Sequence, residues 1–121
     1  MAKILIIDDD VDLVTLLSTL LRSWKYEVAS AVDPAAGLQE ARAFRPDLIL
    51  LDYHMPGSTG AHLFETFRRN QATASTPIIF MSAVASPDIV MSEVADPGNA
   101  RFIPKPVQTA ELHRIIQEML A

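Results

Sequence analysis

The chain has 121 residues and no cysteine, and 50% of its residues are hydrophobic while 21% are charged. This length fits one domain, and the composition is that of a folded protein and not of a disordered one. The lack of cysteine excludes disulfides, zinc–thiolate sites and thiol nucleophiles, and it is compatible with a reducing compartment. A net charge of −5 argues against a general nucleic-acid binder.

No segment of the sequence is typical of a secretory signal peptide or of a membrane span. The apolar residues 4–7 are followed at once by acids, and no longer apolar region precedes them. The longest stretch without charge, residues 70–87, is interrupted by polar residues and by Pro77. We therefore expect a soluble, cytoplasmic chain without a membrane partner.

Short apolar runs alternate with amphipathic stretches, beginning with a predicted strand at residues 4–7. Leucines then recur at spacings of three and four residues as far as Trp24, which is typical of one face of a helix. This spacing predicts that Leu13, Leu16 and Leu20 all belong to the buried face.

The later part of the chain repeats the same order of strand and helix. Asp33 and Pro34 form a typical helix start after a strand at residues 26–31, and Ser86 and Pro87 form another. The remaining strands are predicted at residues 48–51, 77–81 and 101–103, and the helices at residues 34–44, 61–70, 87–94 and from 107 onward.

Strand and helix units repeated in this way are the pattern of a doubly wound parallel sheet. An eight-unit barrel would need about twice the length. The sequence shows no linker, low-complexity tract or other internal repeat. We expect one α/β domain over residues 1–121, with no output domain in this chain.

Polar residues follow the predicted strands where ligands bind in such sheets, at the carboxyl ends. Asp8 and Asp9 follow the first strand, Asp52 the third and Ser82 the fourth, and Lys105 comes just after the fifth. Taken singly, each has an ordinary alternative as a turn or surface residue. Their equivalent positions on successive strands favour one joint site. The neighbouring acids Asp10 and Asp12 are better explained as the start of the first helix.

The residue types at this edge indicate chemistry with a metal and a phosphoryl group. Carboxylates about 5 Å apart repel each other by about 3 kcal/mol per pair at an effective dielectric constant of about 20, so such a cluster favours a bound cation. Oxygen ligands without cysteine favour Mg²⁺ or Mn²⁺, which also bind phosphate oxygens. A carboxylate is the candidate nucleophile, because Ser82 has no base placed beside it.

The chain resembles the receiver domain of two-component response regulators over essentially its whole length. The resemblance lies in five segments in the right order and spacing, namely ILIIDDD at 4–10, PDLILLD at 46–52, HMPG at 54–57 with Gly60, PIIFMSA at 77–83 and FIPKP at 102–106. It implies a flavodoxin-like fold, in which a five-stranded sheet of order 2-1-3-4-5 is combined with five helices.

The resemblance also implies a role for each acid of the site. Asp52 matches the phospho-acceptor, which takes a phosphoryl group from a sensor histidine kinase or a phosphotransfer protein. Asp8 and Asp9 match the acids that bind Mg²⁺ (or Mn²⁺) together with Asp52. Position 54 matches the residue that offers its backbone carbonyl to the metal, so the His54 side chain need not be a ligand.

The remaining matches concern the phosphate and the switch. Lys105 matches the cation that pairs with the phosphoryl group, and Ala83 fits the need for a small residue beside it. Ser82 matches the switch hydroxyl and Phe102 the switch aromatic. Phosphorylation would then change partner binding through the face formed by the fourth helix, fifth strand and fifth helix. The expected partner is a downstream effector or an output domain missing from this chain, and a weak homodimer is compatible with the family.

The expected protein is a signalling domain and not an enzyme, limited to its own phosphorylation and slow self-dephosphorylation. Two alternatives stay open. Asp10 and Asp12 superficially fit the Asp-x-Asp pattern of phosphatases with an aspartyl nucleophile, although they lie beyond the strand end. A pseudo-receiver that never takes phosphate is the other, and the intact set of acids, hydroxyl and lysine argues against it.

Overall fold

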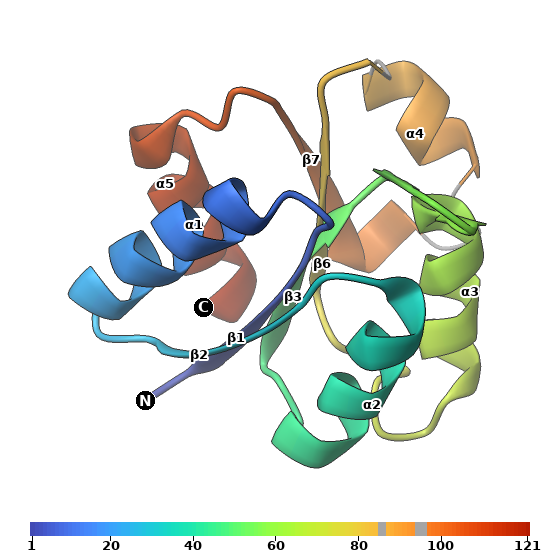
Figure 1. Cartoon of the computed structure of the whole chain (residues 1–121), viewed down its shortest axis with the longest axis horizontal. Coiled ribbons are helices and arrows are strands. Elements are labelled where there is room, and N and C mark those ends of the chain that lie inside the picture. The colour runs from blue at the N-terminus through green and yellow to red at the C-terminus, as the bar shows by residue number, and fades with distance from the viewer. Residues whose placement is uncertain (85–86, 94–96) are drawn as a thin grey trace.

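The computed structural model describes the backbone of residues 1–84, 87–93 and 97–121. A central sheet is covered by helices on both faces (Figure 1). Its strands are β1 (Lys3–Ile7), β2 (Glu27–Ala31), β3 (Leu48–Asp52), β6 (Ile78–Ser82) and β7 (Ala100–Pro104). The helices are α1 (Val11–Ser23), α2 (Pro34–Phe44), α3 (Gly60–Arg69), α4 (Pro87–Glu93) and α5 (Thr109–Leu120).

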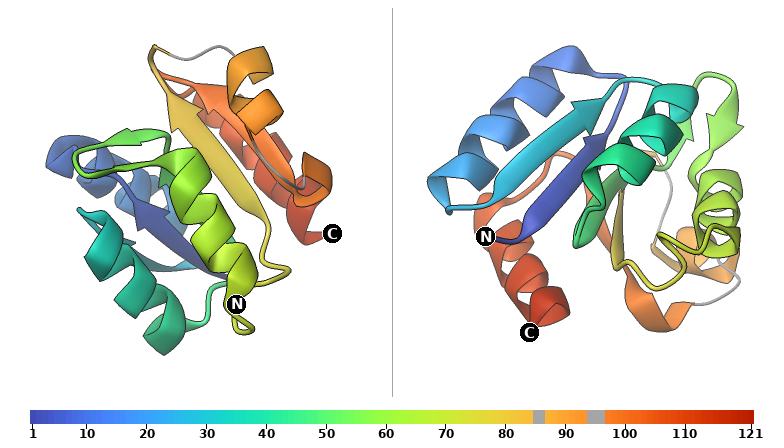
Figure 2. Two further views of the ribbon diagram at one scale, coloured as in Figure 1. Left: turned by 90° about the vertical axis from the view of Figure 1, so that its right-hand side faces the viewer. Right: turned by 90° about the horizontal axis from the view of Figure 1, so that it is seen from below.

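The five strands are parallel and lie in the order β2-β1-β3-β6-β7. Counted along the chain as five strands, this is the predicted order 2-1-3-4-5, so the doubly wound α/β fold is confirmed. The views in Figure 2 show α1 and α5 on one face of the sheet and α2, α3 and α4 on the other. Within the described ranges, none of the helices is long and apolar enough to cross a lipid bilayer.

Alternation along the buried strands divides the interior into two cores. Leu5 and Ile7 of β1 pack toward α2 and α3, whereas Ile4 and Ile6 pack toward α1 and α5. Successive side chains of a strand point to opposite faces, and both faces are covered here. For this reason the strands read as continuous apolar runs in the sequence.

Helix α1 is rotated relative to the arc predicted from its leucines. The residues buried against the sheet are Val14, Leu17, Ser18 and Leu21, while Leu16 is 65% exposed. The prediction that Leu16 belongs to the core is therefore wrong. The leucine spacing spans a wide arc of the helix, and the contact with the sheet selects only one side of it.

The predicted helix starts agree with the structure where it describes them. Asp10 caps α1, with its Oδ1 accepting the Leu13 N–H at 3.2 Å, and Asp33 caps α2 by accepting the Ala36 N–H at 2.7 Å. Pro34 occupies the first turn of α2. The proposed cap at Ser86 lies outside the described residues.

A two-stranded hairpin follows β3, where the sequence pattern indicates neither strand nor helix. Its strands are β4 (His54–Met55) and β5 (Ser58–Thr59), and Gly57 in the turn has a φ of +88°. This left-handed backbone suits glycine at the third position of a turn after proline. The hairpin fixes the chain that leaves Asp52, because the Gly60 N–H donates to the Tyr53 carbonyl at 2.7 Å. Strands of two residues are too short to show a period in the sequence.

Replacing Leu17 by alanine should destabilise the protein far more than the same change at Leu16. Leu17 is 2% exposed, so its truncation leaves a cavity and should lower the free energy of unfolding by about 2–5 kcal/mol. Leu16 is exposed, so Leu16→Ala should change it by no more than about 0.5 kcal/mol. Urea unfolding of both variants measures the difference. Equal losses would restore the original assignment of the buried face.

Candidate functional site

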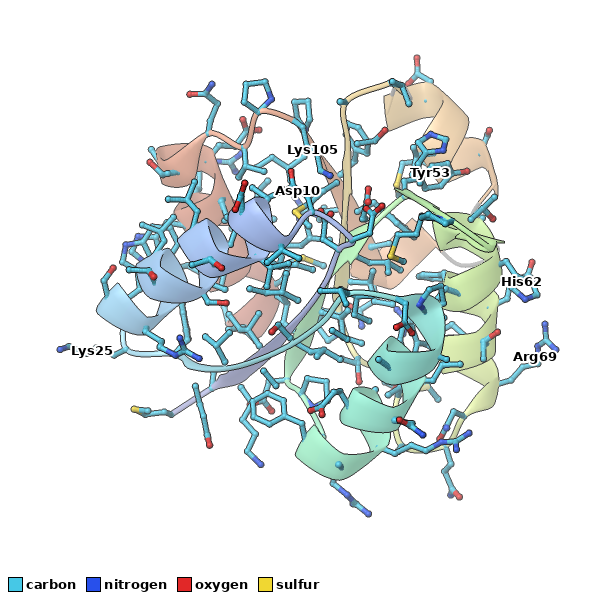
Figure 3. The ribbon with its side chains drawn as sticks, in the orientation of Figure 1. Asp10, Lys25, Tyr53, His62, Arg69 and Lys105 are labelled. Atoms are coloured by element: carbon cyan, nitrogen blue, oxygen red, sulfur yellow. The ribbon has the colours of Figure 1, made fainter. Side chains whose placement is uncertain are left out.

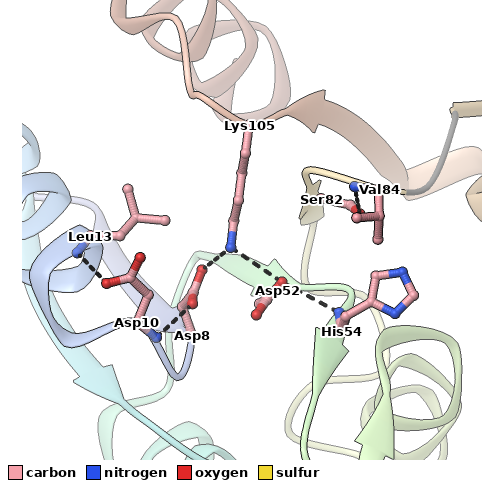
Figure 4. Close-up of polar contacts among 8 residues, drawn as sticks. All are labelled: Asp8, Asp10, Leu13, Asp52, His54, Ser82, Val84 and Lys105. Atoms are coloured by element: carbon pink, nitrogen blue, oxygen red, sulfur yellow. Dashed lines mark hydrogen bonds and ion pairs between the residues drawn. The ribbon is translucent and has the colours of Figure 1, made fainter.

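The predicted site residues converge at the carboxyl edge of the sheet. Asp8 follows β1, Asp52 ends β3 and Ser82 ends β6, and these strands are neighbours in the sheet. Figure 4 shows Asp52 between Asp8 and Ser82, with Lys105 reaching down from the segment after β7. One carboxylate oxygen from each of Asp8, Asp9 and Asp52 lies within 4.8 Å of the others.

Lys105 is the counter-charge of the acids in this structure. Its Nζ lies 2.9 Å from Asp8 Oδ2 and 3.4 Å from Asp52 Oδ1, and its side chain is only 19% exposed. The Lys105–Pro106 peptide bond is cis, and the Lys105 N–H donates to the Ser82 carbonyl at 2.9 Å. Burial by itself lowers the pKa of Lys105, but the hydrogen bond and charge of Asp8 and those of Asp52 outweigh it and raise the pKa.

Asp8 and Asp9 differ in exposure although they are adjacent. Asp8 is fully buried, and its Oδ1 accepts the Asp10 N–H at 2.9 Å while its Oδ2 faces Lys105. Asp9 is exposed at the mouth of the site. The turn into α1 thus holds Asp8 buried at the carboxyl edge of the sheet and leaves Asp9 facing solvent.

Asp52 is held in a setting that disfavours its charge. Burial raises the pKa of Asp52 to about 7, and the charge of Asp8 acts in the same direction. Lys105 and the His54 N–H, which donates to Asp52 Oδ1 at 3.3 Å, lower that pKa but do not compensate. The cost of removing the Asp52 carboxylate from water exceeds its favourable interaction with the Lys105 ammonium, which is shared with Asp8.

The other predicted residues surround this cluster. Ser82 is buried, and its Oγ accepts the Val84 N–H at 3.2 Å, while Ala83 beside it is exposed. The imidazole of His54 is exposed, and its ring meets the Tyr53 ring edge-on at 5.0 Å. Phe102 on β7 is half-buried and packs against the core on the α4 side of the sheet.

The donor set fits a hard divalent cation. Mg²⁺ favours carboxylate oxygens and retains waters, and the acids offer oxygens close together with one of them open to solvent. Among the described residues, the ion pairs of this cluster involve one ammonium, that of Lys105, which contacts Asp8 and Asp52, so the three carboxylates are not fully neutralised. A metal ion would supply positive charge, and a phosphoryl group could then bind between the metal and Lys105.

Comparison with known proteins identifies the family. The model of the response regulator receiver domain matches residues 4–117, so the chain belongs to this family, as its sequence motifs indicated. The structure is similar to the chemotaxis protein CheY4 of Vibrio cholerae, with a TM-score of 0.90, 30% identity and coverage of 99% of each chain.

Two further relatives show the range of proteins that carry this domain. The receiver domain of the sensor histidine kinase PA1611 of Pseudomonas aeruginosa, solved with a magnesium ion in its active-site cleft, has a TM-score of 0.83 at 28% identity and covers 98% of this chain and 97% of its own. Protein RcaC of Microchaete diplosiphon is 30% identical over 97% of this chain. The chain spans only 18% of the length of RcaC.

Two structural features of the site were not foreseen from the sequence. Lys105 is already paired with Asp8, although the resemblance only implied contact with a phosphoryl group. The Asp10 N–H holds Asp8 in place, although Asp10 was read only as a helix cap. The Lys105 contact depends on how the segment after β7 meets the end of β1, and the Asp10 contact depends on the conformation of the turn into α1.

The raised pKa of Asp52 predicts a pH dependence of stability without metal. Its folded-state pKa of about 7 lies above the unfolded value of 3.8, so its stabilising contribution is complete below about pH 4 and is lost as the pH rises to about 7. The free energy of unfolding of wild type minus that of Asp52→Asn should fall over this window by a few kcal/mol at most, on the order of 1.4 kcal/mol for each pKa unit. Chelator-treated protein, unfolded in urea at several pH values, measures it. A flat difference would show that Asp52 ionises normally.

Proposed function

We propose that this receiver domain takes a phosphoryl group onto Asp52 from a phosphohistidine of a sensor histidine kinase or phosphotransfer protein. The observation that carries the proposal is the position of Asp52, buried at the end of the central strand with Asp8 on one side and Lys105 within 3.4 Å. Asp8 offers a second carboxylate for a metal ion, and Lys105 offers a cation for a phosphoryl group on Asp52.

Mg²⁺, or Mn²⁺ in its place, is the proposed cofactor. Asp8, Asp9 and Asp52 would hold it, with the backbone carbonyl of His54 as a further ligand. When bound, the metal supplies positive charge for the phosphoryl oxygens. The proposal is supported by the clustered carboxylate oxygens and by the raised pKa of Asp52, since a cation there would favour the ionised nucleophile.

Transfer would occur by attack of an Asp52 carboxylate oxygen on phosphorus. An O–P bond forms, the P–N bond to the donor imidazole breaks, and the imidazole leaves with the electron pair of that bond. The product is an acyl phosphate on Asp52. Lys105 would then pair with a phosphoryl oxygen, and the small exposed side chain of Ala83 leaves room beside it.

The switch would use Ser82 and Phe102. The hydroxyl of Ser82 would turn to the phosphoryl group, and Phe102, half-buried on β7, would turn further inward. The face formed by α4, β7 and α5 would thereby change its affinity for a downstream effector or an output domain. In this role the protein is a signalling domain and not a turnover enzyme.

The phosphatase alternative gains no support from the described residues. Asp10 uses an oxygen to cap α1, and both Asp10 and Asp12 are exposed and do not join the clustered acids. The pseudo-receiver alternative also weakens, because Asp8, Asp9, Asp52 and Lys105 are not merely present but adjacent.

Incubation with acetyl phosphate and Mg²⁺ should label wild type but not Asp52→Asn. The product should be one equivalent of phosphate that hydroxylamine releases, because an acyl phosphate reacts with that nucleophile. Asp88→Asn, which removes an exposed acid on α4, is the matched control and should label normally. Equal labelling of Asp52→Asn would disprove the proposed acceptor. Turnover of p-nitrophenyl phosphate beyond one equivalent would favour the phosphatase.

Mg²⁺ should raise the melting temperature of wild type, and Asp9→Asn should remove most of that effect. At pH 8 and without metal, Asp9→Asn should itself raise the free energy of unfolding by a few tenths to about 1 kcal/mol, because one repulsive charge is gone from an exposed position. Asp12→Asn is the matched control and should retain the Mg²⁺ response. Lower metal-free stability of Asp9→Asn would contradict the repulsion argument.

A further inference from the structure

Tyr53, the residue directly after the proposed acceptor, carries a buried hydroxyl that has no hydrogen-bond partner among the described residues. The residue is only 3% exposed. Figure 3 shows it on the side of the sheet that α3 and α4 cover. Such a hydroxyl costs free energy, because it has lost its hydrogen bonds to water and gained none in the protein. A group of this kind in a folded protein calls for a physical explanation.

The ring of Tyr53 is packed tightly between its neighbours. It meets the Phe80 ring edge-on, with the ring centroids 5.8 Å apart, and the His54 ring at 5.0 Å. A Cβ atom placed on Gly60 would lie only 2.9 Å from Tyr53 Cδ1, so the start of α3 closes that side. The Tyr53 N–H also donates to the Met81 carbonyl at 2.9 Å. The hydroxyl therefore stays away from water as long as these neighbours keep their positions.

Tyr53 belongs to a row of three aromatic side chains, Tyr53, Phe80 and Phe102, that runs across neighbouring strands. Tyr53 follows β3, Phe80 lies on β6, and Phe102 on β7 pairs with Phe80 in register. All three pack in the core on the α4 side of the sheet, and Val90 of α4 is fully buried in the same core. Tyr53 and Phe102 are therefore the two ends of one aromatic row beneath α4.

The proposed inward turn of Phe102 would push a further part of its ring into this row. Protein interiors are packed too densely to accept such a volume without movement of a neighbour. Since Val90 covers the row, the turn would displace α4, the Tyr53 ring or both. Either movement opens the Tyr53 end of the row to water. The hydroxyl then recovers a hydrogen bond to solvent.

We propose that the Tyr53 hydroxyl biases the receiver toward its phosphorylated conformation, because it is buried without a partner in the resting form and hydrated in the switched form. The inference rests on the proposed function, since it requires that phosphorylation of Asp52 turns Phe102 inward. It assigns a role to a core hydroxyl that takes no part in phosphoryl transfer. Its effect is on the equilibrium between the two conformations.

Tyr53→Phe tests the inference, because this change removes the hydroxyl and keeps the ring. Urea unfolding without ligand should give a folding equilibrium constant at least about fivefold above that of wild type, since the unpaired group is gone from the resting form. Beryllium fluoride with Mg²⁺, an analogue of a phosphoryl group on a carboxylate, should bind more weakly by about the same factor in calorimetric titration. The two factors should agree, because a free protein that is mainly in the resting form binds the analogue in proportion to its switched fraction.

Tyr26→Phe is the matched control. Tyr26 is the other tyrosine of the chain, and it packs on the opposite side of the sheet, in the core of α1 and α5. This variant should leave the dissociation constant for beryllium fluoride unchanged.

A Phe102→Ala background tests the route through the aromatic row. In that background Tyr53→Phe should still raise the folding equilibrium constant. It should no longer weaken binding of the analogue, because a methyl group can turn inward without displacing α4 or Tyr53. The comparison is made between the single and the double variant.

Four outcomes would overturn the inference. They are an unchanged stability of Tyr53→Phe, a gain in its stability with unchanged analogue binding, an equal loss of binding in Tyr26→Phe, and a loss that persists in the Phe102→Ala background. A wild type that does not bind the analogue at all would contradict the proposed function itself, and the inference with it.

Discussion

The ammonium of Lys105, shared between Asp8 and Asp52, is the interaction on which the site depends. Asp8 is fully buried, and a buried charge is tolerated only when it is paired and hydrogen-bonded. Meeting that need requires the ends of β1, β3 and β7 to meet at one edge of the sheet. The sheet order, the turn into α1 and the path after β7 all serve to place these groups together.

The Lys105 ammonium does not neutralise the carboxylates of Asp8, Asp9 and Asp52, and this excess of negative charge accounts for the electrostatics of the site. The pKa of Asp52 is raised to about 7 because burial and Asp8 together outweigh Lys105. The carboxyl edge of the sheet thus holds an excess of negative charge, which a bound metal ion would relieve. A cation gains more from binding to such a site than to one whose carboxylates are already neutralised.

Helix α1 connects this edge to the rest of the surface. Its cap, Asp10, gives its backbone N–H to Asp8 and its carboxylate to the first turn of the helix. Its inner side packs on the sheet through Leu17, and its outer side presents Leu16. One helix therefore holds Asp8 in place through the Asp10 N–H and also presents an apolar side chain, Leu16, to solvent.

The sequence by itself determined the fold class, the order of the elements and the edge at which the polar residues gather. Buried parallel strands must be continuous apolar runs, and polar residues at their ends mark the carboxyl edge, so both features are local and readable. Tertiary structure alone decided which arc of α1 is buried, that Asp8 and Asp52 share Lys105, and that a hairpin follows Asp52. The first two features depend on contacts between segments far apart in the chain, whereas the strands of the hairpin have two residues each and are too short to show a period in the sequence.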